Sequence, residues 1–91
     1  MPDLRLRQHL FRQCIPAGVP LHTDVDLDEL ADRYKFSGGD VRNAVYRAAA
    51  TAALREEGER VVEQADLLAA CEVEKTKARG AMYEAMQNQY L

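Results

Sequence analysis

Apolar residues recur at helical spacing in four segments of this chain. In residues 3–14, Leu6, Leu10 and Cys14 follow one another every four positions, which is the repeat of one face of a helix. A break with prolines and a glycine spans residues 15–23, and its apolar side chains must lie against a core. The pattern therefore predicts a helix over residues 3–14 and a loop after it.

Two further helices follow this loop. The first is short, about residues 27–34, and Asp26 with Glu29 three positions later has the spacing of a capping box. The second opens after Ser37, a good N-cap residue, and continues as an alanine-rich stripe that we expect Gly58 to stop. Because alanine lets neighbouring helices approach closely, we expect this helix at the centre of a bundle.

A fourth helix opens at Glu63 or Gln64 and can extend to residue 88. Its apolar pattern is regular up to Lys75 and weakens beyond that point. We therefore expect residues 76–91 to form a helical extension. Its apolar side chains have no evident partner within the domain and predict self-association or docking: Met82, Tyr83, Met86 and Tyr90.

Length and composition narrow the fold class. A chain of 91 residues allows one domain, and 47% hydrophobic with 30% charged residues is a globular composition. Alternating runs of β-branched residues, which are typical of strands, are missing from the sequence. We therefore predict an all-α fold, a small four-helix bundle with a longer C-terminal helix.

The charge pattern disfavours nucleic acid as a partner. The net charge is −3, and acidic blocks lie on both sides of a basic stretch over residues 41–55. Nonspecific nucleic-acid binding depends on an excess of lysine and arginine. A helix-turn-helix DNA binder that places Arg42, Arg47 and Arg55 on phosphates is therefore a weak hypothesis.

The sequence gives no sign of a membrane segment or of secretion. No apolar run approaches the length of a membrane span, and charges occupy the N-terminal positions where a signal peptide is apolar. Two cysteines, Cys14 and Cys71, are too few for a disulfide framework, and we expect reduced thiols. Together these features predict a cytoplasmic protein.

The motifs of self-contained catalysis are missing. The sequence has no GxxxxGK[ST] phosphate loop and no GxGxxG, and His9 and His22 lack Cys or His at metal-binding spacing. Thr23 and Ser37 have the positions of loop and cap residues, so no nucleophile with its base can be assembled. We therefore predict no catalytic residue, no metal site and no enzymatic activity of this chain alone.

Three motifs in order carry a more specific signal. Residues 20–31 are PLHTDVDLDELA, residues 36–45 are FSGGDVRNAV, and residues 48–50 are three alanines. At these separations they resemble the C-terminal helical lid of AAA+ ATPases, and the GGDVRN version is most similar to bacterial members of the AAA family. The resemblance covers residues 4–74, so we expect residues 1–75 to form the lid domain.

The resemblance implies a nucleotide-dependent role within a larger protein. In such ATPases the lid follows an α/β core, ATP lies in the crevice between them, and rotation of the lid passes the nucleotide state to the next subunit of a ring. The implied cofactor is ATP, with Mg in the parent protein. The implied partners are the α/β core of the same chain and the neighbouring ring subunits. The lid alone is expected to be inert and to bind no nucleotide tightly, because it lacks the phosphate-binding core.

The resemblance also implies site residues. It places the end of the first helix and the following loop beside the adenine, and the Ser-Gly-Gly-Asp turn beside the base and ribose. Paired glycines at a helix start would permit close backbone approach to a ligand there, and the helix N-terminus offers free N–H groups. A tight turn with an N-cap is the simpler interpretation of that segment. The implied nucleotide-binding residues are Phe11, Cys14, Ile15, Gly38, Gly39 and Asp40.

Further positions on the third helix are candidates for protein contacts. Arg42 and Asn43 could face the core or the next subunit. Two positions depart from the family pattern. Cys14 stands where many lids have a histidine against adenine, and a thiol is a poor hydrogen-bond donor. Asp40 stands where many AAA+ lids carry an arginine that reaches the γ-phosphate, a residue that the narrower AAA family also lacks.

A free-standing helical interaction module is the alternative to a lid. The two interpretations make different demands on the surface. A lid leaves apolar surface uncovered near Phe11, Ile15 and the Gly38-Gly39 pair, because its core domain packs there. An independent module closes this face and exposes apolar side chains only near the C-terminus.

Overall fold

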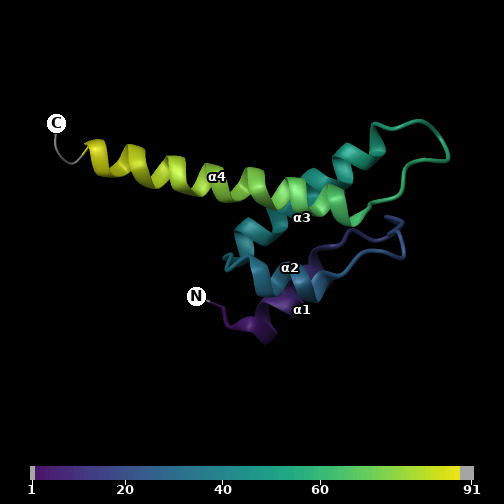
Figure 1. Cartoon of the computed structure of the whole chain (residues 1–91), viewed down its shortest axis with the longest axis horizontal. Helices are drawn as coiled ribbons and strands as arrows, with labels where there is room; N and C mark the ends of the chain where they lie inside the picture. The colour runs from purple at the N-terminus through teal and green to yellow at the C-terminus, as the bar shows by residue number, and fades with distance from the viewer. Residues whose placement is uncertain (1, 89–91) are drawn as a thin grey trace.

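Four helices make up the fold, as the hydrophobic pattern predicts. A computed structural model describes the backbone of residues 2–88 and the side chains of residues 2–77. Its helices are α1 (Leu4–Cys14), α2 (Leu27–Arg33), α3 (Gly38–Ala53) and α4 (Gln64–Asn88). The described chain contains no strand, only an isolated bridge between Leu21 and Val62. The prediction of an all-α bundle with a longer C-terminal helix is therefore confirmed (Figure 1).

The caps explain where the first helices begin. The Asp3 side chain accepts a hydrogen bond from the N–H of Leu6 at 2.9 Å, and the Asp26 side chain accepts one from Glu29 at 3.1 Å. Ser37 and Asp40 form a reciprocal capping box at the start of α3.

The helix α3 ends earlier than predicted. It stops at Ala53, and Leu54 is its C-cap, whereas we expected Gly58 to stop it. Gly58 instead has φ +92° and belongs to the turn that follows, a conformation that suits glycine. The early end places Arg55 beside the first turn of α4.

The core lies on both sides of α3, which confirms its predicted central place. The helix packs against α1 on one side and against α4 on the other, while α2 packs against α1. The buried side chains of α3 are small: Val41, Ala44, Val45, Ala48 and Ala52. They meet buried side chains of the other helices, which are Phe11, Leu30, Leu67 and Cys71. Small residues on the central helix therefore let its neighbours approach closely.

The phase of α1 differs from the prediction. Leu6, expected in a buried stripe with Leu10 and Cys14, is 48% exposed, and the latter two are half-buried. The buried side chains of α1 are instead Arg7 and Phe11. The leucine stripe of this helix consequently lies at the edge of the core.

Hydrogen bonds to backbone carbonyls explain how an arginine takes a buried position. Arg7 Nε donates to the carbonyl oxygen of Ala31 at 2.8 Å, and Nη1 donates to that of Pro2 at 2.8 Å. A buried polar group is tolerated when it is hydrogen-bonded in this way. Arg7 thereby joins α1 to α2, and the leucine stripe lies to one side of the buried face that Arg7 shares with Phe11.

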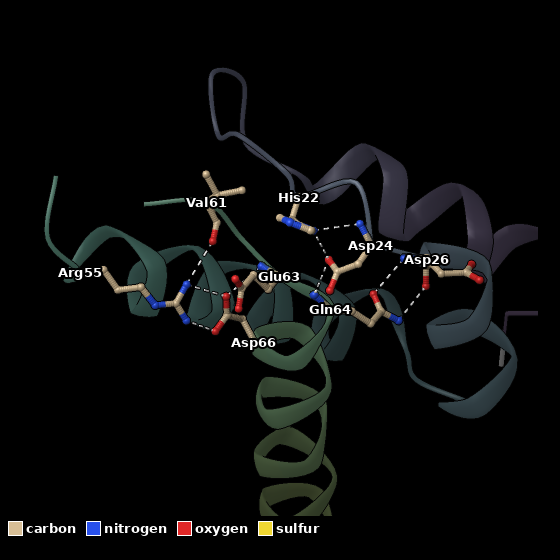
Figure 2. Close-up of polar contacts among 8 residues, drawn as sticks. All are labelled: His22, Asp24, Asp26, Arg55, Val61, Glu63, Gln64 and Asp66. Atoms are coloured by element: carbon tan, nitrogen blue, oxygen red, sulfur yellow. Dashed lines mark hydrogen bonds and ion pairs between the residues drawn. The ribbon is translucent and has the colours of Figure 1, made fainter. Parts of the chain in front are cut away.

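Polar contacts fix the loop before α2 to the start of α4 (Figure 2). The backbone N–H of His22 donates to the carbonyl of Val62 at 2.8 Å. Gln64 donates its backbone N–H to Asp24 at 3.2 Å, and its side-chain oxygen accepts from the N–H of Asp26 at 2.9 Å. These contacts span about 40 positions of sequence, so they close the bundle at this end.

A half-buried ion pair joins the end of α3 to the start of α4. The Asp66 carboxylate accepts hydrogen bonds from both terminal nitrogens of Arg55, one of them at 2.9 Å (Figure 2). It also accepts one from the backbone N–H of Glu63 at 2.9 Å. The hydrogen bonds from Arg55 hold the pKa of Asp66 below its ordinary value, against the opposing effect of burial. Ionised Asp66 therefore both pairs with the arginine that follows the C-cap of α3 and caps α4.

Replacing Asp66 should destabilise the fold in a pH-dependent way. Asp66→Ala removes the cap and the ion pair, so we expect a loss of about 2 kcal/mol near neutral pH. Because folding lowers the pKa of Asp66, its stabilisation is complete above the unfolded value of about 3.9 and disappears as the pH falls below it. Urea unfolding followed by circular dichroism at pH 7 and pH 3 measures both effects.

The matched control is Asp28→Ala, which breaks the exposed pair with Arg12. Both partners are more than half exposed, so we expect a loss below about 0.5 kcal/mol. Equal losses for Asp28→Ala and Asp66→Ala at pH 7 would contradict the role assigned to the Asp66 pair.

Candidate functional site

The sequence-predicted site residues lie on two surfaces near the start of α3. The first surface, which we call the α1–α3 face, comprises the predicted Cys14, Ile15, Gly38 and Gly39 together with Leu6 and Leu10 of α1. The second carries the side chains of Arg42 and Asn43. Asn43 faces α4, because its amide donates to Glu74 at 3.2 Å.

The α1–α3 face is built where the leucine stripe of α1 passes the first turn of α3. A Cβ atom built on Gly38 would lie 3.8 Å from Leu10, so the two helices are in van der Waals range here. Leu10, Cys14 and Ile15 are each half-buried and pack against the edge of the core. An apolar surface therefore begins at Leu6 and continues to the loop after α1.

Phe11 differs from its predicted companions. Its side chain has no exposed surface and lies within the core. In this conformation it supports Leu10 and Ile15 from within and offers no surface of its own to a ligand. The neighbouring leucine stripe, which we expected to be buried, provides the exposed apolar surface.

The fold does not need glycine at either position of the Gly38-Gly39 pair. Neither residue has a positive φ, since among the described glycines only Gly18 and Gly58 do. A Cβ atom on Gly39 would meet only the Ser37 hydroxyl at 3.9 Å, and one on Gly38 would make an ordinary contact. Alanine would also be the better helix former at both positions. The packing of the described residues therefore leaves room for a side chain at both positions.

The side chain of Asp40 takes part in the capping box at the start of α3. Its carboxylate accepts from the backbone N–H of Ser37 at 3.2 Å, while its own N–H donates to the Ser37 hydroxyl at 3.3 Å. Gly38 and Gly39 stand at the first two positions of α3, where backbone N–H groups have no acceptor within the helix. Those two groups are the donors that this helix start can offer to a ligand.

The second surface includes residues that the sequence analysis did not identify. Glu74 is only 5% exposed, and one of its carboxylate oxygens has no hydrogen-bond partner among the described residues. The other oxygen accepts from Asn43. The guanidinium of Arg42 lies 5.5 Å from the ring centre of Tyr46, on the outer side of α3. Periodicity could not single out Glu74, because glutamate is ordinary on a helix surface.

The structure also bears on catalysis and metal binding. No group of three His, Cys, Asp or Glu that could hold a metal ion occurs among the residues that the structure describes. His22 and Asp24 are exposed partners in a loop, 3.0 Å apart. Among the described residues no helix is long and apolar enough to cross a membrane.

Comparisons with known proteins bear on the family and the fold of this chain. The family described as "AAA+ lid domain" matches residues 24–69, which is half of the chain. No curated protein matches this chain significantly. Eight chains in solved structures match, among them one from a structure described as "Structural Basis for Katanin Self-Assembly". That chain is 25% identical, with a TM-score of 0.66, and the match covers 79% of this chain and 31% of the other.

The two thiols should differ sharply in reactivity. Burial raises the pKa of Cys71 to about 12, whereas Cys14 is half-buried on the α1–α3 face. The thiolate attacks the disulfide reagent and displaces its leaving thiolate, so we expect one equivalent of thiol to react in the folded protein and two in denaturant. Absorbance titration with mass mapping measures this. Labelling of Cys71 ahead of Cys14 would contradict the placement of both.

Proposed function

This chain belongs to the family of AAA+ lid domains, and we propose that it covers the adenine side of the ATP site in an AAA+ ATPase. The observation that carries the proposal is the α1–α3 face. There a partly open apolar stripe passes a helix start whose two glycines the fold itself does not need. Apolar surface of this kind is expected where another domain and a ligand complete the packing.

The described residues fit the adenine end of ATP better than its phosphate end. Leu10, Cys14 and Ile15 offer apolar contact to a flat base, and Phe11 holds them in place from the core. The free N–H groups of Gly38 and Gly39 lie at the same edge and could donate to the base or ribose. The phosphates and Mg would be held by the α/β core, since this sequence has no phosphate loop.

The packing of α3 supports a mechanical role for the lid. This helix begins at the proposed nucleotide site and packs along its length against α1 and α4. Closely packed helices move together because their interfaces do not deform continuously. A shift of the α3 start on nucleotide binding or release would therefore move α4 as well. We infer that this couples nucleotide state to the movement of neighbouring subunits in a ring.

A free-standing interaction module is supported less well. That alternative predicts a closed α1–α3 face, whereas Leu6 is 48% exposed and its neighbours on the face are half-buried. The side chains of Met82, Tyr83, Met86 and Tyr90, on which its docking surface would depend, lie outside the described residues. We therefore propose that residues 1–75 form the lid domain and that residues 76–91 extend it.

Substituting a glycine should separate nucleotide binding from folding. In the intact ATPase, Gly39→Ala places a methyl group at the proposed site, and we expect the KM for ATP to rise about tenfold, equivalent to about 1.4 kcal/mol. The isolated chain should keep its stability within about 0.5 kcal/mol, because the added Cβ meets nothing closer than 3.9 Å.

The matched control is Gly58→Ala, which forces alanine into a positive φ far from the site. It should cost about 1 kcal/mol of stability and leave the KM unchanged. An unchanged KM for Gly39→Ala, in a protein that folds normally, would contradict the proposed site.

The isolated chain should bind ATP very weakly. Most of the affinity for ATP comes from the phosphates, whose binding elements are missing from this sequence. Calorimetric titration with Mg-ATP should give no saturation at micromolar concentrations. Micromolar affinity would mean that the chain holds a complete nucleotide site and is more than a lid.

A further inference from the structure

The seam between α3 and α4 forms a second candidate binding surface, independent of the proposed nucleotide site. Two neighbouring hollows lie along it. One has a volume of about 440 Å³ and is lined by Asn43, Tyr46, Arg47, Ala50 and Lys77. The other has a volume of about 280 Å³ and is lined by Arg47, Thr51, Asp66, Ala69, Ala70 and Val73. Arg47 lines both, so the two hollows adjoin each other, and we call the pair the α3–α4 groove.

Small residues line much of this groove, and two larger side chains stand exposed beside it. Ala50, Ala69, Ala70 and Thr51 leave room for a close approach, as small residues do at helix interfaces. Val73 is 41% exposed and Tyr46 is 48% exposed. From Asn43 to Thr51 the groove extends for about 12 Å, the rise of about two helical turns. Its dimensions therefore suit one face of a short helix.

The exposed charge along the groove is positive. Arg42, Arg47 and Lys77 take part in no ion pair among the residues whose side chains are described. Among the described residues, Asp66 is the one acidic side chain that lines the two hollows, and it pairs with Arg55. Glu72 and Glu74 accept from the neutral groups of Tyr34 and Asn43 and keep their charge, but neither lines a hollow, and Glu74 is only 5% exposed.

We propose that the α3–α4 groove binds an acidic amphipathic helix of a partner protein. Alanine or leucine side chains of that helix would fill the two hollows beside Val73 and Ala50. Its carboxylates would pair with the three unpaired cations at the rim, of which Arg42 is held over Tyr46. Such complementary charge fixes the register of a partner and increases the rate of association. The acidic blocks that flank residues 41–55 disfavour nucleic acid in the same groove.

Peptide titration tests the proposal on the chain itself. The probe is a synthetic three-turn helical peptide with leucine and alanine on one face and glutamate on the other. Added to the isotope-labelled chain, it should shift the backbone amide signals of Arg47, Ala50 and Val73 at low salt. The same peptide with lysine in place of glutamate should cause no such shifts.

Charge reversal identifies the residues responsible. Arg47→Glu combined with Lys77→Glu should weaken binding of the acidic peptide at least tenfold, and circular dichroism should show an unchanged fold. Arg33→Glu is the matched control, because Arg33 stacks over Tyr34 at 5.8 Å much as Arg42 stacks over Tyr46. This control should bind the peptide as the parent chain does.

Several outcomes would overturn the proposal. These are an absence of shifts along the seam, equal binding of the lysine peptide, or equal weakening by Arg33→Glu. Shifts of the same amides by duplex DNA, but not by the acidic peptide, would identify a nucleic-acid site instead. None of these outcomes bears on the KM effect of Gly39→Ala, so the two proposals fail separately.

Discussion

The close packing of α3 between α1 and α4 is the constraint on which the rest of this structure depends. Its inward face is built of alanine and valine, all of them almost completely buried. A larger side chain at Ala44 or Ala48 would force the neighbouring helices apart and open the core. Because α3 also begins at the proposed nucleotide site, the same packing joins that site to α4 (Figure 1).

Much of the fold could be predicted from the sequence, because local signals agreed with tertiary packing. The caps at Asp26 and Ser37 each accept the hydrogen bond that their spacing predicts. The end of α3 was predicted wrongly, since Gly58 serves a turn and the helix stops before it. A glycine signals a positive φ, but the sequence does not say whether a helix reaches it.

The candidate site was predictable only in part, and the reasons lie in α1. Periodicity alone could not choose between the stripe of Leu6 and the stripe of Phe11, because both have helical spacing. Arg7 lies with Phe11 on the buried face, where its guanidinium donates to the carbonyls of Pro2 and Ala31, and the apolar pattern contains no sign of these hydrogen bonds. The family resemblance identified the Gly38-Gly39 turn, but only the structure shows that packing leaves room for a side chain at both positions. Likewise, the positive charge of the groove between α3 and α4 could not be predicted from the sequence, because it depends on the pairing of Asp66 with Arg55.

Photoaffinity labelling of the intact ATPase tests the central claim most directly. A nucleotide with a photoreactive group on its adenine ring would be bound, irradiated and mapped by mass spectrometry. A lid that covers the base predicts adducts within residues 10–15 or 38–40, prevented by excess ATP. Adducts confined to other parts of the protein, with equal protection by ATP, would contradict the assignment of this domain to the adenine side of the site.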